Sequence, residues 1–180
     1  MKYIAFLRGI NVGGSKKIIM KELAAAFTDA GYEDVKTYIQ SGNVLFSTVK
    51  KSPSSLEKDA SALIKKSFGH DVEIMVRTGK EMNDIIKAAP FKKKDIDSGK
   101  LLYITMLKEK LTVENVKLLK SLTNPQEIFH YHNKEIYTIR DPKVSYDKAV
   151  LGTFDKKLKV STTTRNWNVM NKLNELINES

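Results

Sequence analysis

The spacing of apolar and polar positions in the first half of the chain predicts four strands and two helices. Strands are expected at runs that are continuously apolar or alternate with polar residues, namely Tyr3–Arg8, Val35–Gln40, Val44–Ser47 and Val72–Arg77. Helices are expected where apolar residues recur every three or four positions, namely over Lys16–Ala30 and from the capping box Ser54–Glu57 along Leu56, Ala60, Leu63 and Ile64. In chain order these elements form βαββαβ, the ferredoxin-like sandwich.

The second half of the chain partly repeats this order after a connecting segment. Residues 80–89 are expected to form a short helix that ends before Pro90, and the polar residues 92–99 a loop. Further strands are expected at Leu101–Leu107, Ile128–His132 and Ile136–Arg140, and further helices after Thr112, over Tyr146–Leu158 and over Asn166–Ile177. The pattern does not indicate a last strand in this second copy, so that strand is expected to be lost or altered.

These elements predict an α+β fold with two related parts. The first part is a ferredoxin-like βαββαβ subdomain at residues 1–78, followed by a connecting helix and loop at residues 79–100. The second part is a partly repeated βαββα subdomain with a C-terminal helix at residues 101–180. The repeat lies in the order of the elements and not in residue identity.

A glycine-rich turn after the first strand is the strongest candidate for a binding site. Such a turn between a strand and a helix can point bare backbone N–H groups at an anion, with the helix dipole behind them. The first two strands of a βαββαβ sheet run in the same direction, so this turn and the one after the second strand leave the sheet at the same end. Arg77 is expected at the opposite end. The residues expected to meet at the site are Arg8, Asn11, Gly13, Gly14, Ser15, Lys16, Gln40, Ser41, Gly42 and Asn43.

A simpler interpretation of the same turn stays open. Gly13 and Gly14 also serve if they only permit a tight connection between strand and helix. The turn matches no nucleotide fingerprint, because Gly9 and Gly14 have P-loop spacing while Ser15-Lys16 reverses the required order of lysine and hydroxyl residue. A backbone anion site, with Arg8 or Lys16 as the counter-charge, is the functional interpretation that remains.

A second unusual segment, Thr162–Asn168, holds the chain's single tryptophan and one of its four arginines. In a functional interpretation, Arg165 and Asn166 reach a ligand. In the structural alternative Thr164 caps the last helix, Trp167 lies in the core and Arg165 donates to a carbonyl.

Charge adds a second class of partner. The 180-residue chain has a formal net charge of +10 and an isoelectric point of about 9.6, which suggests RNA or DNA binding through lysine. The lysines are scattered in short runs, and the third expected strand lacks the spaced aromatics with which such sheets bind RNA. Nucleic acid is therefore an alternative rather than the first choice. A protein-interaction or assembly domain is a third possibility.

Several kinds of chemistry find no support in the sequence. The chain has no cysteine, and no catalytic constellation or cofactor is indicated. His130 and His132 share one strand face without a third ligand, so no metal is expected. No apolar run approaches the roughly 18 residues of a membrane span. The short apolar start does not suit a signal peptide, and a cytoplasmic location is expected.

Three motifs resemble those of the bacterial family called domain of unknown function 1697. They are Arg8–Gly14, followed by Met20 and Leu23, then Thr37–Val44, and Thr163–Asn168. The resemblance covers essentially the whole chain and implies a two-part α+β fold of ferredoxin-like character in a cytoplasmic bacterial protein. It implies no activity and supplies no catalytic residues. The expectation from the residues is thus a protein that binds a phosphate-bearing small molecule at the glycine turn.

Overall fold

The computed structural model describes residues 1–14, 16–145 and 148–179. Within it the chain forms two compact units. Unit 1 consists of Met1–Asp84 together with Leu173–Ser180, and unit 2 consists of Ile85–Lys172. Each unit is built around its own four-stranded sheet.

Unit 1 has the βαββαβ order that the sequence predicts. Its elements are β1 (Lys2–Leu7), α1 (Met20–Asp29), β2 (Glu33–Thr37), β3 (Asn43–Ser47), α2 (Pro53–Phe68) and β4 (Ile74–Thr78). The strands lie side by side in the order β2-β3-β1-β4, and every neighbouring pair is antiparallel. Strands β1 and β2 are therefore parallel, so their C-terminal ends lie at the same end of the sheet.

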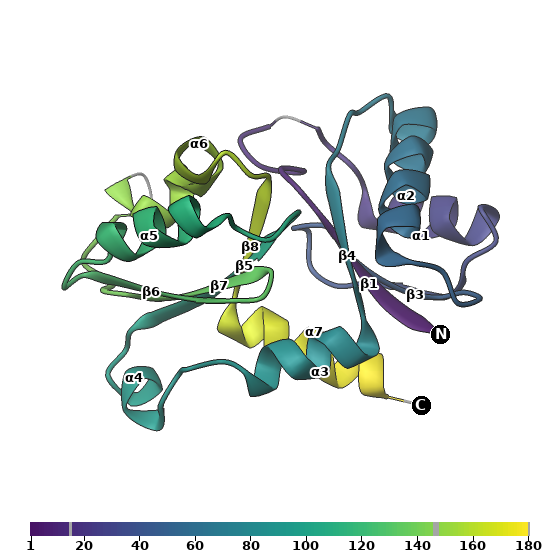
Figure 1. Cartoon of the computed structure of the whole chain (residues 1–180). Coiled ribbons are helices and arrows are strands. Elements are labelled where there is room, and N and C mark those ends of the chain that lie inside the picture. The colour runs from purple at the N-terminus through teal and green to yellow at the C-terminus, as the bar shows by residue number, and fades with distance from the viewer. Residues whose placement is uncertain (15, 146–147, 180) are drawn as a thin grey trace. The chain divides into compact units, whose positions relative to one another are not determined.

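The core of unit 1 lies between its sheet and the helices α1 and α2 (Figure 1). Alternate residues of β1, namely Tyr3, Ala5 and Leu7, join the core with Phe27 of α1 and Phe46 of β3. The rings of Phe27 and Phe46 lie 5.6 Å apart. The intervening residues of β1 are also shielded from solvent, as the uninterrupted apolar run predicts. Among the described residues, the aromatic side chains of β1 are thus buried and do not form the exposed platform used to stack RNA bases.

Unit 2 repeats the same connectivity in full. Helix α3 (Gly79–Lys87) leads into it, and α7 (Trp167–Asn178) leads out. Its elements are α4 (Lys93–Asp97), β5 (Leu101–Leu107), α5 (Val113–Leu122), β6 (Glu127–His132), β7 (Glu135–Arg140), the 3-10 helix η2 (Val150–Thr153), α6 (Phe154–Leu158) and β8 (Thr162–Asn166). The strand order is β6-β7-β5-β8, and the core lies under α5 and α6. The α+β fold with two similar subdomains is therefore confirmed.

Strand β8 completes the second repeat, although the hydrophobic pattern gave no strand there. Its sequence is Thr-Thr-Thr-Arg-Asn, which has no apolar alternation, but β-branched threonine is well suited to a strand. The strand is antiparallel to β5, and the hydroxyl oxygens of Thr105 and Thr164 lie 2.8 Å apart across the pair. Hydrogen bonds to β5, rather than an apolar stripe, keep β8 in the sheet.

The helix starts also differ from the sequence-based boundaries. Helix α1 begins at Met20 rather than at Lys16, because Lys16 has a left-handed φ of 47° that cannot continue a right-handed helix. Helix α2 is capped by Ser52, whose side chain accepts from the N–H of Ser55, rather than by Ser54. Helix α4 forms where a loop was expected. In the expected helix Tyr146–Leu158, Tyr146 and Asp147 lie outside the described residues, and η2 and α6 occupy the rest.

Candidate functional site

The glycine turn after β1 and the turn after β2 lie against each other in unit 1. We call them the glycine loop (residues 8–18) and the 38–43 turn. The side-chain NH2 of Asn11 donates to the carbonyl oxygens of Ile18 and Gln40, each at 3.0 Å. The Leu7 N–H donates to the Gly42 carbonyl at 2.8 Å. The structure thus brings together the two turns that the topology predicts to converge. Arg77, opposite Ile4 in the register of β1 and β4, lies towards the other end.

Left-handed backbone dominates the glycine loop. Positive φ angles occur at Gly9 (64°), Asn11 (55°), Gly13 (59°), Gly14 (79°) and Lys16 (47°). A Cβ atom added to Gly13 or Gly14 would meet nothing within 4 Å. These two glycines are therefore required by their backbone angles and not by lack of space. They leave an exposed strip of main chain that no side chain of their own covers. Ser15, the next residue of the predicted site, lies outside the described residues.

Asn11 is the brace of the loop rather than a free ligand group. Besides its two donated bonds, its side-chain oxygen accepts from the N–H of Ile18 at 2.9 Å. One carboxamide therefore joins the start of the loop, its end and the 38–43 turn. The loop keeps its shape through this side chain.

The 38–43 turn is also tightly packed. A Cβ on Gly42, whose φ is 75°, would lie 2.7 Å from Cδ1 of Ile10 and 2.8 Å from Cβ of Leu7. Asn43 is fully buried and donates to the Tyr38 carbonyl at 2.9 Å and to the Ser41 hydroxyl at 3.1 Å. Gly42 and Asn43 hence form the turn, while the Gln40 side chain is exposed.

Ile39, next to Gln40, has a φ of 51° and is 45% exposed. A β-branched residue in the left-handed region is strained, and such strain costs on the order of 1–3 kcal/mol and often marks functional segments.

Two cations border the loop, and each already has an acidic or carbonyl partner. Arg8 forms an ion pair with Glu73 at 2.8 Å in which both side chains are well exposed. The Lys16 ammonium donates to the main-chain carbonyl of Asp71 at 2.5 Å. The carboxylate of Asp71 pairs with Lys65 at 2.8 Å, and the hydrogen bond from Lys65 lowers the pKa of Asp71. The rim of the loop is therefore mixed in charge.

The sequence reasoning missed the acidic part of this rim. The register of β1 against β4 pairs Leu7 with Ile74, which places Glu73 beside Arg8 across the pair. That antiparallel register was the signal that could have identified Glu73. The expectation of a helix dipole directly behind the glycines needs correction too, since α1 begins only at Met20, six positions beyond Gly14.

Arg165 and Asn166 lie in unit 2, at the end of β8. Arg165 is 7% exposed and donates to the Thr163 hydroxyl and the Thr164 carbonyl, each at 2.9 Å. Burial lowers the pKa of Arg165 to about 10, so the guanidinium stays charged at neutral pH. The side-chain oxygen of Asn166 accepts from the N–H of Val169 at 2.8 Å. Asn166 therefore caps α7, the role that the structural alternative gave to Thr164.

Metal clusters and membrane-spanning helices are absent from the part of the chain that the structure describes. Within residues 1–14, 16–145 and 148–179, no group of three or more histidine, cysteine or acidic side chains could hold a metal ion. His130 and His132 both lie exposed on β6. In the same part of the chain, no helix is long and apolar enough to cross a membrane.

Comparison with known proteins places this fold. The structure of the conserved bacterial protein SP0830 from Streptococcus pneumoniae is similar, with a TM-score of 0.78 and 22% sequence identity over 98% of each chain. At that identity the likeness concerns the fold alone. No curated protein matches the chain. A sequence model of the family described as "Protein of unknown function (DUF1697)" matches residues 1–137. The chain therefore belongs to the DUF1697 family of proteins of unknown function.

Proposed function

We propose that this protein binds an anionic, phosphate-bearing small molecule at the glycine loop, chiefly through main-chain N–H groups. The observation that carries the proposal is the exposed left-handed pair Gly13-Gly14. Successive N–H groups in turns of this kind form concave nests that hold anions. Within the described residues, the main-chain N–H groups of Gly13 and Gly14 make no hydrogen bond. Both are therefore available to a ligand.

The bracing by Asn11 supports the proposal. Its three hydrogen bonds hold the loop against the 38–43 turn, so the N–H groups need not be ordered when a ligand arrives. A preorganised loop loses less conformational entropy on binding. The strained backbone at Ile39 also supports a preorganised site, because strained backbone persists where the surrounding contacts fix it.

The flanking charges are compatible with an anion. The ion pair of Arg8 with Glu73 is solvent-exposed, and such pairs are worth only about 0–1 kcal/mol. A phosphate group carrying more than one negative charge can draw Arg8 or Lys16 towards it at small cost. The proposal includes a bacterial cytoplasmic setting, which fits a chain without cysteine and a solved structural relative from a bacterium.

A thermal-shift and calorimetric panel tests this function. Inorganic phosphate, sulfate, sugar phosphates and nucleotides are compared with chloride at matched ionic strength. A ligand at about 100 times its Kd adds about 2.7 kcal/mol of stability, which corresponds to a rise in Tm of several degrees. The variant Lys16→Gln is expected to weaken binding about three- to tenfold, because it removes a positive charge two positions along the chain from Gly14.

The matched control is Lys17→Gln, which removes the same charge at an exposed position of the loop one residue further from Gly13 and Gly14 and should leave affinity unchanged. No shift with any anion, or equal losses in the two lysine variants, would contradict the proposal. Affinity for short RNA or DNA that falls with a log–log salt slope of several units would instead favour the nucleic-acid alternative.

A further inference from the structure

Unit 2 contains a pocket that the glycine-loop proposal does not use. It measures about 300 Å³, within the range of small-molecule sites. It lies where β5 begins and β8 ends, since Tyr103 and Asn166 are paired across these strands. We call it the Trp167 pocket, and the lining residues that matter for its chemistry are Ile96, Lys100, Tyr103, Asn166, Trp167 and Asn168.

The aromatic side of the pocket is the Trp167 ring, which neighbouring side chains fix in position. The Trp167 ring meets Phe91 edge to face, with centroids 5.1 Å apart, and Phe91 meets Tyr137 in the same way at 6.0 Å. The Tyr137 hydroxyl donates to the Ile85 carbonyl at 2.9 Å. Tyr103, by contrast, packs with the core on the opposite face of the sheet, where buried Arg140 donates to its hydroxyl at 3.1 Å. A fixed ring such as that of Trp167 suits a planar ligand.

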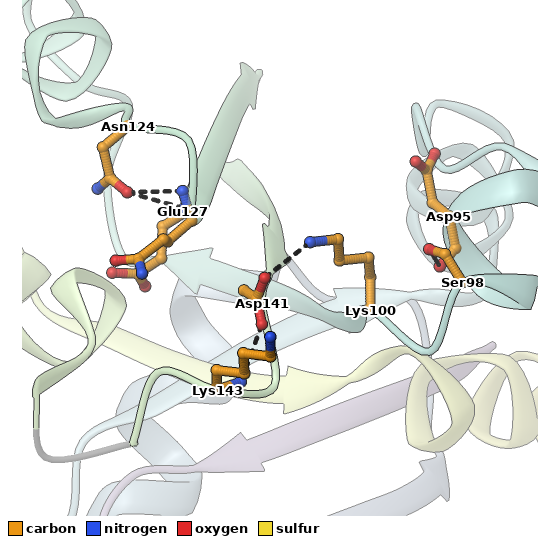
Figure 2. A network of polar contacts seen from close by, with 8 residues as sticks. Asp95, Ser98, Lys100, Asn124, Glu127, Asp141 and Lys143 are labelled. Carbon is orange, nitrogen blue, oxygen red and sulfur yellow. Dashed lines mark hydrogen bonds and ion pairs between the residues drawn. The ribbon is translucent and has the colours of Figure 1, made fainter.

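The single cation of the lining is positioned by a carboxylate. Figure 2 shows Lys100 reaching towards Asp141, and its ammonium lies 3.1 Å from the Asp141 carboxylate. The other oxygen of Asp141 accepts from the N–H of Lys143 at 2.9 Å. The pKa of Asp141 is lowered first by that backbone hydrogen bond and then by Lys100. Asp141 therefore stays ionised and orients Lys100, which keeps two further N–H groups for a ligand.

The remaining polar lining consists of donors. The oxygen of the Asn166 carboxamide is occupied by the Val169 N–H, so its NH2 group is the part left for a ligand. In the described part of the chain, this NH2 group, the Asn168 side chain and the Trp167 indole N–H make no hydrogen bond. Among the described residues, no acidic side chain lines the pocket, and the carboxylate that pairs with Lys100 belongs to Asp141, outside the lining. Donors and a cation in the lining favour a ligand that is rich in acceptors and negatively charged.

We infer that the Trp167 pocket binds a small planar aromatic or heteroaromatic acid. The ring would lie against Trp167, with Ile96 on the apolar side, and the carboxylate or phosphate would be held by Lys100 and Asn166. The inference stands apart from the proposed function, because every lining residue belongs to unit 2 and the glycine loop belongs to unit 1.

Intrinsic fluorescence tests the inference directly, because Trp167 is the only tryptophan of the chain. The full-length protein is titrated with adenosine monophosphate, benzoate, adenosine and inorganic phosphate. We expect saturable quenching or a spectral shift with the two ring-bearing anions. Uncharged adenosine and inorganic phosphate should bind at least about tenfold more weakly, since each lacks one of the two recognised features.

Two lysine variants distinguish binding in the Trp167 pocket from a general effect of the protein's positive charge. Lys100→Met is expected to weaken binding of the ring-bearing anions about tenfold or more. Lys143→Met is the matched control, because Lys143 contacts Asp141 through its backbone N–H and its side chain is not part of the lining; this variant should bind as the wild type does. Circular dichroism verifies that both variants fold.

Three results would overturn the inference: no fluorescence change with any probe, inorganic phosphate binding as well as adenosine monophosphate, or equal losses in the two variants. The variant Lys16→Gln distinguishes this site from the glycine loop. It should leave the Trp167 signal with benzoate unchanged even where it weakens the binding of inorganic phosphate measured by calorimetry.

Discussion

Glycine is needed for different reasons at different residues of the two facing turns. At Gly13 the backbone is left-handed and the surrounding space is open, whereas at Gly42 a left-handed backbone coincides with atoms of Ile10 and Leu7 less than 3 Å from an added Cβ. The first position demands only a backbone angle, and the second also forbids a side chain. The distinction matters because only the first kind of glycine leaves main chain exposed to a ligand.

This difference predicts unequal losses of stability. Gly13→Ala should cost about 1–2 kcal/mol, the strain of a left-handed alanine. Gly42→Ala should lose a further 1–3 kcal/mol or so, because its Cβ overpacks the contact with Ile10. Urea denaturation of the two variants measures the difference. Equal free energies of unfolding for the two would show that the turn around Gly42 relaxes freely.

At the scale of elements, helices α1 and α2 begin in contrasting ways. Helix α2 starts with Ser52 as its cap and Pro53 in the first turn, both of which stabilise a helix start. Helix α1 starts after Ile19, whose side chain makes no capping hydrogen bond and is 53% exposed. The start of α1 is thus weak in itself, and tertiary packing of Leu23 and Phe27 holds the helix in place.

We therefore expect opposite effects from two cap substitutions. Ile19→Asp should stabilise the protein by about 1 kcal/mol, because its carboxylate can accept from the first turn and the backbone there is already extended. Ser52→Ala should destabilise by about the same amount, through loss of the bond to Ser55. Thermal melts followed by circular dichroism at neutral pH measure both. A lower Tm for Ile19→Asp would mean that the exposed isoleucine contributes to packing.

For the whole molecule, the dependence of stability on pH tests the charge distribution. Several carboxylates have lowered pKa values in the folded state: Asp71 through Lys65, Glu114 through its own backbone N–H and Asp141 through the Lys143 N–H. A carboxylate with a lowered folded pKa contributes stability above its unfolded pKa and loses it as the pH falls through the folded value. Protonation also adds to a net charge of +10, which increases repulsion.

We accordingly expect the free energy of unfolding to fall as the pH drops below about 4. In Asp141→Asn the free energy of unfolding should fall less steeply over this acid range, which we call the acid limb, since the amide does not titrate. Asp97→Asn, at an exposed aspartate, is the control and should leave the limb as it is. Denaturation curves from pH 7 to pH 2.5 give the comparison. If the free energy of unfolding of Asp141→Asn falls with pH as steeply as that of the wild type, Asp141 does not contribute to the acid sensitivity.

The sequence by itself determined the order of the elements in unit 1 and the meeting of its two turns. Apolar periodicity is a local property, and the direction of the strands in a βαββαβ sheet follows from their order. It did not reveal β8, because strand pairing rather than an apolar stripe holds Thr162–Asn166 in place.

Only the tertiary structure decided what the side chains of the glycine loop contact. Asn11 braces the loop and Asn43 closes the 38–43 turn. Arg8 and Lys16 contact Glu73 and Asp71, which are 65 and 55 positions away in the sequence. The Trp167 pocket likewise joins Lys100 to Asn166 across a strand pair. Contacts between residues so distant in sequence depend on register and packing, which no local pattern encodes.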